Sequence, residues 1–454
     1  MSEESKSGFL ERTLKNLRHA WQGIAGSEYD ESAASLQPDL PETDAARLLE
    51  QMHACLETRG GEVSARARAA ALGRAYLALN KTGKVRFLTV LAENFDVDHG
   101  AVDAAVLSLQ QASDQAARLQ AEADLRKVLE PPRLKLLTQF NALPEGVKFL
   151  VDMRADLLAA NGGDSLLNGL EQDLKGLLIT WFDVDFLELR RISWDSSSAS
   201  LLEKLIAYEA VHAIESWDDL KNRLDSDRRC FAYFHPRMPD EPLIFVEVAL
   251  VDGMSDSIQA LLDGSAPVID PTSADTAIFY SISNAQKGLA GISFGNFLIK
   301  GVVNSLSSEF KRLKTFATLS PVPGFKAWLD KRLAAGDNDA ELKVLLDDSG
   351  WPDDKQASDA LQGPLKRLAA QYLAAEKMRK GGLRALDPVA HFHLSNGARI
   401  ERLNWLGDVS AKGLGQSAGL MVNYLYKLSH VEANHEAYTS SGKVAASSSV
   451  RSLL

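Results

Sequence analysis

The first 182 residues carry apolar side chains at helical spacing. One stripe consists of Phe87, Leu91 and Phe95, each four residues from the next, which places all three on one face of a helix. Residues that interrupt helices, such as Pro131-Pro132 and Asn161-Gly162-Gly163, separate such stretches. The pattern predicts an all-helical bundle of seven or eight helices over residues 1–182.

From about residue 183 the pattern changes to short runs of β-branched and aromatic residues next to turn formers, which is typical of strands. The runs with this character are Cys230–His235, Leu243–Val251 and Ala277–Ser283. Stretches with helical spacing lie between them, at Leu201–Val211 and Phe297–Phe310. We therefore expect an α+β chain, with a helical bundle over residues 1–182 and a mixed α/β domain over residues 183–454.

The charge balance limits the possible partners. Lys and Arg number 50 against 61 Asp and Glu, a formal net charge of −11, which argues against nucleic acid or an anionic membrane as a partner. A local basic site for a small anion remains compatible with this charge. The longest stretch without a charged residue, Gly413–Tyr426, is too short and too polar to cross a bilayer.

Cysteine usage and the first residues bear on the compartment. Cys55 and Cys230 are the two cysteines, too few for a disulfide framework or a cysteine-based metal site. They suit a reducing compartment. The first residues, MSEESKSGF, are polar and lack the apolar segment of a secretory signal, so we expect a cytoplasmic location.

A glycine-containing loop lies between the predicted strand Ala277–Ser283 and the predicted helix that follows. Gly288, Gly291 and Gly295 lie in it, and Asn296 is a candidate N-cap. Glycines let the main chain approach an anion closely, and a helix N-terminus offers free N–H groups. The loop is a cradle of pyrophosphate size, although it matches neither the Walker pattern nor GxGxxG. The alternative is an ordinary loop before a core helix.

Ser320 lies in the segment TLSPVPGF, residues 318–325, after a predicted strand over Thr315–Leu319. Pro321 and Pro323 fix their own φ angles and keep the residues before them extended. A hydroxyl held on such a stiff turn can make one hydrogen bond with little reorganisation, as a catalytic site requires. The alternative is a rigid loop in which the serine only caps the main chain.

Two further segments carry candidate chemistry. His391 and His393 alternate in HFHLSNGA, so on an extended segment they would face the same side, and imidazole suits proton transfer. No nearby carboxylate or cysteine completes a metal ligand set, so we expect no metal, and a solvated or core histidine is the alternative. Near the end of the chain, Asn423, Tyr424 and Tyr426 could line a pocket or belong to a core helix.

Several segments together resemble the malonyl-CoA decarboxylase family. They are FYSIS at 279–283, FLIK at 297–300, FATLSPVPGFKAWL at 316–329, HFHLSNGA at 391–398 and GLMVNYLY at 419–426. The resemblance covers about residues 170–430 and is fainter through the helical half. The SPxPGF and HFHLxNGA blocks, in this order along the chain, are the most specific part of it.

The resemblance implies a reaction and a fold. Malonyl-CoA would be converted to acetyl-CoA and CO2 without a cofactor, since CoA is part of the substrate. The helical bundle would make the contacts of a homodimer or homotetramer, and residues 183–454 would form a CoA-binding catalytic domain like that of the GNAT acetyltransferases. The alternatives that we weighed are a GNAT-type acyltransferase and a non-catalytic CoA sensor.

The resemblance also implies roles for residues. Ser320 and His393 match the catalytic pair, and Ser281 and Tyr426 match further residues of the substrate pocket. The loop that holds the CoA pyrophosphate is matched by Ala290, Gly291, Ile292, Ser293, Phe294, Gly295 and Asn296. The resemblance implies an acidic residue where this chain has Ser293, so the tuning of the histidine must come from another group or be weaker.

From these matches we expect His393 to donate a proton to the carbanion that decarboxylation leaves. We expect Ser320 to bond the malonyl carboxylate or to relay the proton. Which of the two contacts the carboxylate stays open at this point.

Overall fold

The computed structural model describes residues 17–22, 24, 36–56, 61–160, 162–182, 186–292, 297–335, 340–348, 350–379 and 381–454. By their contacts the residues divide into two compact units. The first is Met1–Leu187 with His235–Glu241 and Gln286–Ser293, and the second is Glu188–Phe234, Pro242–Ala285 and Phe294–Leu454. Two segments from the second half of the sequence thus belong to the first unit. No helix in the described part of the chain is long and apolar enough to cross a membrane.

The first unit is helical, as the apolar spacing predicts. Its helices in the described residues are α2 (Glu42–Leu56), α3 (Gly61–Ala78), α4 (Lys81–Asn94), α5 (His99–Gln111), α6 (Gln115–Val128), α7 (Pro132–Asn141), α8 (Gly146–Ala160) and α9 (Ser165–Trp181). Asn80, Asp98 and Asp164 begin α4, α5 and α9 by accepting hydrogen bonds from main-chain N–H groups of the first turn. The stripe that predicted α4 is buried, with Phe87 and Leu91 fully enclosed.

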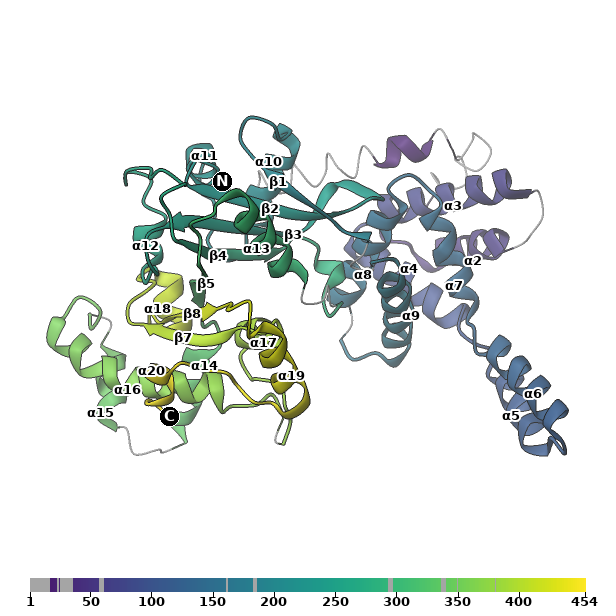
Figure 1. Cartoon of the computed structure of the whole chain (residues 1–454). Helices are drawn as coiled ribbons and strands as arrows, with labels where there is room; N and C mark the ends of the chain where they lie inside the picture. Colours follow the sequence, from purple (N-terminus) through teal and green to yellow (C-terminus); the bar gives the residue numbers. More distant parts are fainter. Residues whose placement is uncertain are drawn as a thin grey trace. The chain divides into compact units, whose positions relative to one another are not determined.

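The helices α5 and α6 form a hairpin that contributes little to this core. The two helices contact each other and extend away from the other helices of their unit (Figure 1). No residue of α5 is buried, and Ala121 is the buried residue of α6. Leu107, Leu119 and Leu129 are each at least half exposed.

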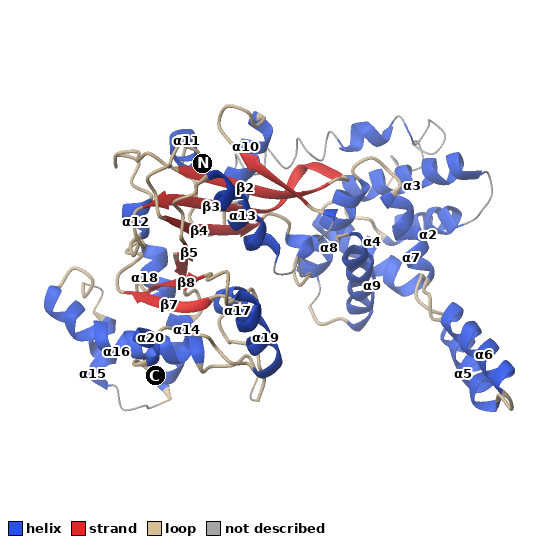
Figure 2. Ribbon diagram, in the orientation of Figure 1, coloured by secondary structure: helices blue, strands red, loops and turns tan. Residues whose placement is uncertain are grey.

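A mixed sheet forms the centre of the second unit (Figure 2). Its strands are β1 (Glu188–Ile192), β2 (Arg228–His235), β3 (Met238–Val251), β4 (Thr276–Asn284), β5 (Thr315–Thr318), β6 (Ser320–Pro321), β7 (Arg399–Asn404) and β8 (Met421–Leu425). The order is β1-β2-β3-β4-β5-β8-β6, and β7 also pairs with β8. The pair β4–β5 is parallel, whereas β1–β2, β3–β4, β5–β8, β6–β8 and β7–β8 are antiparallel.

Helices complete the second unit. They are α10 (Ala199–Tyr208), α11 (Trp217–Arg223), α12 (Ile258–Leu261), α13 (Phe297–Glu309), α14 (Phe325–Ala334), α15 (Ala340–Asp347), α16 (Lys355–Ala374), α17 (Pro388–Ser395), α18 (Ala411–Ser417), α19 (Val431–Ser441) and α20 (Ser448–Arg451). The predicted order of a helical bundle and a mixed α/β domain is confirmed. One strand differs: β3 begins at Met238 and includes Pro239 and Pro242, which we expected to precede it.

The alternation of side chains along β2 assigns helices to the two faces of the sheet. Cys230, Ala232 and Phe234 pack with α10 and α11 on one face. Tyr233 points the other way, and its hydroxyl donates to the Leu298 carbonyl of α13 at 3.2 Å. Because neighbouring residues of a strand face opposite sides, α10 and α13 cover opposite faces of the sheet.

Candidate active site

The parallel strand β5 pairs along its whole length with the first half of β4. Their register runs from Thr276 opposite Thr315 to Phe279 opposite Thr318. Beyond this point β4 continues to Asn284. The segment that follows β5 continues into β6, which pairs with β8 instead. Ser320 therefore follows the place where the two parallel strands stop pairing.

Ser320 is buried and hydrogen-bonded on two sides. Its Oγ donates to Thr318 Oγ1 at 2.9 Å and lies 3.1 Å from His393 Nε2. Thr318 and Ser320 are two residues apart in extended chain, so their side chains share a face of the sheet. The structure thus brings together Ser320 and His393, which lie 73 residues apart in the sequence.

His393 lies on a helix, and our expectation of an extended segment is wrong. Asp387 caps α17 by accepting a hydrogen bond from Ala390 N, and Pro388 occupies the first helical position. On a helix, residues two apart point about 200° from each other. His391 accordingly bonds elsewhere, to the Tyr438 hydroxyl at 2.9 Å, and His393 alone reaches Ser320.

The directions of these hydrogen bonds assign the proton positions. The single hydroxyl hydrogen of Ser320 is donated to Thr318. The hydrogen bond between Ser320 and His393 must therefore use a hydrogen on His393 Nε2. The Nδ1 atom of His393 then accepts from the Tyr426 hydroxyl, 2.7 Å away. The result is a directed chain from Tyr426 through His393 and Ser320 to Thr318.

Burial keeps the members of this chain uncharged. It lowers the pKa of His393 from 6.5 to about 3, because a low-dielectric surrounding disfavours the imidazolium ion. Burial also raises the pKa of Tyr426 well above its usual value, so its hydroxyl keeps the proton. At neutral pH the site holds a neutral imidazole with a fixed tautomer.

Aromatic side chains enclose the imidazole of His393. The ring of Tyr424 stacks on it with 4.5 Å between ring centres, and Tyr426 meets Phe279 edge to face at 6.5 Å. The hydroxyl of Tyr424 is buried without a hydrogen-bond partner in the described part of the chain. This apolar enclosure is the physical source of the low pKa of His393.

A pocket of about 590 Å³ borders this site and reaches Tyr426. It lies between residues of α13 and α19. Its lining is Ile299, Lys300, Val303, Asn304, Asn396, Tyr426, Leu428, Val431 and Glu432. Most of this wall is apolar, which is the usual character of a pocket for an organic ligand.

Ser281 does not join the chain of Tyr426, His393 and Ser320. Its Oγ donates to Glu209, 2.7 Å from Oε2. In the register of β3 and β4, Ser281 lies opposite Glu247 and shares its face, whereas Phe279 lies opposite Val248. The extra residue between the two pairs is Tyr280, which forms a β-bulge there.

Sequence reasoning missed Glu209, because it lay at the end of a predicted helix. The structure ends α10 at Tyr208, and the buried Glu209 carboxylate accepts from Val211 N, His212 N and the Ser283 hydroxyl. Nearby, burial and Glu209 raise the pKa of Glu247 to about 8, although Arg223 lies 3.2 Å from its carboxylate. The chain therefore holds a second buried polar cluster next to Ser281.

The predicted pyrophosphate loop is described in part. Ala290, Gly291 and Ile292 lie in the first unit, and Gly291 has a positive φ of 72°, which favours glycine. The other residues assigned to this loop, Ser293, Phe294, Gly295 and Asn296, lie outside the described residues. The predicted role of Asn296 as an N-cap therefore stays a prediction.

The helices of the first unit hold this loop. Arg154 of α8 donates to the carbonyls of Gly288 and Ala290 and forms an ion pair with Glu171 of α9 at 2.6 Å. A side chain at Gly288 would overlap the carbonyl oxygen of Val151, so the loop and α8 can pack this closely only with glycine there.

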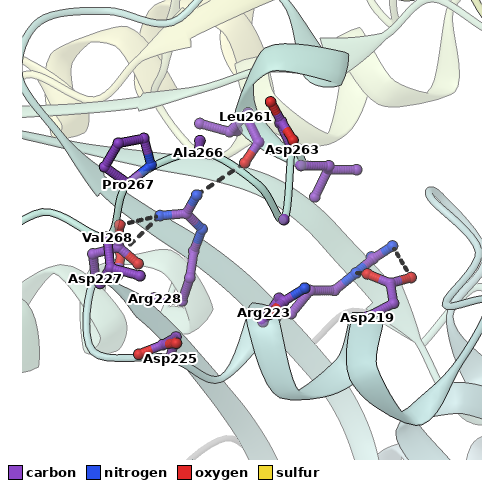
Figure 3. Close-up of a pocket in the computed structure, with 13 residues that line it drawn as sticks. Asp219, Arg223, Asp225, Asp227, Arg228, Leu261, Asp263, Ala266, Pro267 and Val268 are labelled. Atoms are coloured by element: carbon purple, nitrogen blue, oxygen red, sulfur yellow. Dashed lines mark hydrogen bonds and ion pairs between the residues drawn. The ribbon is translucent and has the colours of Figure 1, made fainter.

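A second pocket, of about 440 Å³, is lined by charged residues of the second unit (Figure 3). Its two arginines are paired with carboxylates of the same lining: Arg223 with Asp219 at 2.9 Å, and Arg228 with Asp227 at 2.9 Å. Arg228 also donates to the Leu261 carbonyl. Both arginines that line this pocket thus already have carboxylate partners, which makes it a poor site for an anionic ligand.

The model of the malonyl-CoA decarboxylase C-terminal domain matches residues 185–454, and that of the N-terminal domain matches residues 95–182. The mitochondrial malonyl-CoA decarboxylase of Rattus norvegicus is 38% identical, over 95% of this chain and 92% of the rat protein. That of Mus musculus is 39% identical over the same shares.

Solved structures agree with these matches. The malonyl-CoA decarboxylase of Rhodopseudomonas palustris superposes with a TM-score of 0.84 and 44% identity, covering 90% of this chain and 99% of that one. The enzyme from Agrobacterium vitis gives 0.82 and 44%, covering 89% of this chain and 99% of that one. The chain described here belongs to the malonyl-CoA decarboxylase family.

Proposed function

We propose that this chain converts malonyl-CoA to acetyl-CoA and CO2. The observation that carries the proposal is the directed hydrogen-bond chain of Tyr426, His393 and Ser320 beside an apolar pocket, in a member of this family. The substrate brings its own thioester, which can accept the electrons released with CO2. The proposal therefore needs no cofactor.

The pocket between α13 and α19 fits the arm of a CoA thioester. Its mostly apolar lining with a few polar side chains is the usual character of a pocket for an organic ligand. Val303, Leu428 and Val431 supply apolar walls for an extended chain, and Tyr426 lies at the end next to His393. A thioester at that end would lie at the start of the hydrogen-bond chain that runs from Tyr426 through His393 to Ser320.

The chemistry balances with these groups. The bond between the α-carbon and the carboxylate breaks, CO2 leaves, and the electron pair passes into the thioester carbonyl to give an enolate. Ser320 gives its proton to the α-carbon, the Nε2 proton of His393 replaces it, and the Tyr426 hydroxyl proton passes to Nδ1, so that the negative charge rests on Tyr426 at the pocket. Solvent returns one proton to the relay per turnover. The neutral state of His393 means that it acts through an N–H group and not as an imidazolium ion.

The first experiment measures CO2 and acetyl-CoA released from malonyl-CoA by the purified protein. We expect the two products in equal amounts. Acyl transfer to an amine without CO2 would show an acyltransferase, and CoA binding without turnover would show a sensor. Either result would contradict the proposal.

We also propose that the chain forms a homo-oligomer through α5 and α6. The support is the row of exposed leucines, Leu107, Leu119 and Leu129, on a hairpin that buries almost none of its own residues. Mass photometry of the wild type should show a dimer or tetramer. Replacing Leu107 and Leu119 with Ser should shift it toward monomer, and exchanging the exposed Val344 of α15 for Ser should not.

We propose a cytoplasmic location. Cys55 and Cys230 are both free and buried, as in proteins of a reducing compartment. The rat and mouse relatives are named as mitochondrial. Fractionation of cells that express the chain with a C-terminal tag distinguishes a cytoplasmic from a mitochondrial location. Recovery of the tagged protein in the mitochondrial fraction would contradict the proposal.

A further inference from the structure

Lys175, on α9 of the first unit, lies beside the backbone of Gly291. A methyl group built on Gly291 would lie 3.6 Å from Lys175 Nζ, and the atoms found within 4 Å of it are Nζ and Cε of Lys175. Among the described residues, the ammonium group is therefore the polar group that lies next to this main-chain position, whose φ is 72°. A ligand that approached this stretch of backbone would meet the ammonium group directly.

The acidic side chains near Lys175 form ion pairs with other basic side chains. Asp173 pairs with Arg133 at 2.6 Å, Glu171 with Arg154 at 2.6 Å and Asp152 with Lys148 at 2.5 Å. In the described part of the chain no carboxylate forms an ion pair with Lys175. Lys175 is thus an available positive charge in a chain whose net charge is −11.

The position of Gly291 relative to α9 is set before any ligand binds. Arg154 holds the carbonyls of Gly288 and Ala290, and Glu171, on the same helix as Lys175, holds Arg154. Gly288 packs against the main chain of α8 at Val151. Because this anchoring is buried, a ligand would meet Lys175 beside a stretch of backbone that is already held in place.

We propose that Lys175 binds the diphosphate of the CoA substrate beside the backbone of Gly291. The proposal rests on the function proposed above. A lysine ammonium is a compact charge suited to phosphate oxygens, and an open glycine backbone admits a bulky anion beside it. Neither the resemblance nor the comparisons assign a binding role to Lys175.

The test compares Lys175→Gln with a matched control on three substrates. Lys135→Gln removes the same charge from an exposed position on α7 of the same unit. The substrates are malonyl-CoA, malonyl-3′-dephospho-CoA, which keeps the diphosphate, and malonyl-pantetheine, which has no phosphate. The readouts are kcat and KM for CO2 release, with thermal unfolding to check the fold.

We expect Lys175→Gln to raise KM about tenfold for malonyl-CoA and for the dephospho substrate, which corresponds to ~1.4 kcal/mol of binding. Its kcat should stay within about twofold of the wild type, and KM for malonyl-pantetheine should not change. Added salt should raise KM less in Lys175→Gln than in the wild type, because the screened contact is already absent. Lys175→Arg should restore most of the affinity, and Lys135→Gln should behave as wild type.

The proposal is wrong if Lys175→Gln has the KM of the wild type for malonyl-CoA, or if KM rises equally for malonyl-pantetheine. If Lys175→Gln raised KM for malonyl-CoA but not for malonyl-3′-dephospho-CoA, Lys175 would bind the 3′-phosphate. That result would also overturn the proposal. If the wild type releases no CO2 from malonyl-CoA, the proposed function fails instead. Titration calorimetry with CoA and pantetheine then tests Lys175 alone, with a tenfold weaker affinity expected for CoA only.

Discussion

Replacing Tyr426 with Phe tests whether the proton positions assigned around His393 matter for catalysis. The change removes one oxygen and leaves the ring that meets Phe279. It takes away the O–H that donates to His393 Nδ1 over 2.7 Å. The Nδ1 atom is then a buried acceptor with no donor, and the preference for a proton on Nε2 weakens.

The expected magnitude follows from that unpaired acceptor. Leaving a buried polar atom without its partner costs about 1–3 kcal/mol, and if the loss falls on the reacting state, kcat decreases by about 10- to 100-fold. KM should change little, because the ring of Tyr426 still forms the end of the pocket. The free energy of unfolding should fall by a similar 1–3 kcal/mol.

Tyr424→Phe is the matched control. Tyr424 is also buried and stacks on His393, but its hydroxyl has no hydrogen-bond partner in the residues that the structure describes. Steady-state CO2 release should therefore give near wild-type kcat for Tyr424→Phe and a lowered kcat for Tyr426→Phe. Equal kcat values for the two variants would refute the assigned hydrogen-bond chain.

Three further predictions concern the relay and the loop. Ser320→Ala and His393→Asn should each lower kcat for CO2 release by at least ~100-fold; near-normal release by His393→Asn would remove the histidine from the mechanism. Because the folded state keeps His393 neutral down to a pKa of about 3, whereas the unfolded chain protonates it near 6.5, its contribution to stability falls as the pH drops through this window. Urea unfolding should show that lowering the pH from 7 to 5 destabilises the wild type by about 2 kcal/mol more than His393→Asn, and equal losses would contradict the low pKa. Arg154→Met leaves the buried Glu171 without its cation and should lower the unfolding free energy by about 3–5 kcal/mol, which the same titrations measure; a loss below 1 kcal/mol would show that the pair is dispensable.

Local periodicity was enough to predict much of the fold. The stripe Phe87, Leu91 and Phe95 indicated α4, and the β-branched runs indicated β2, β3 and β4, because these signals depend on neighbours in the sequence. The start of β3 was misplaced because two prolines normally limit a strand. Proline can lie in a strand where its missing N–H group is not needed for pairing.

The candidate site depends on pairings between distant segments, so only part of it was predictable. Ser320, His393 and Tyr426 were found through whole sequence blocks that resemble a family. Thr318 was missed as a partner of Ser320, although two residues that are two apart in an extended segment share a face and can bond each other. For His391, Asp387 followed by Pro388 was a usable signal for a helix start, and it would have separated the two histidines.

Glu209 and Lys175 gave no signal in the sequence at all. Both act through residues more than 70 positions away, Ser281 and Gly291. Such side chains look like ordinary surface residues of helices until the fold brings their partners next to them.

The loop around Gly288 has a consequence for how such a protein can change in evolution. Residues 286–293 are encoded between β4 and α13 but fold as part of the helical unit, where Arg154 and Val151 shape them. A gene fragment that starts at residue 188 would encode this loop without the helices that shape it. Recombination that joins the sheet unit to an unrelated helical partner would lose this fit, so the two halves are expected to be inherited together.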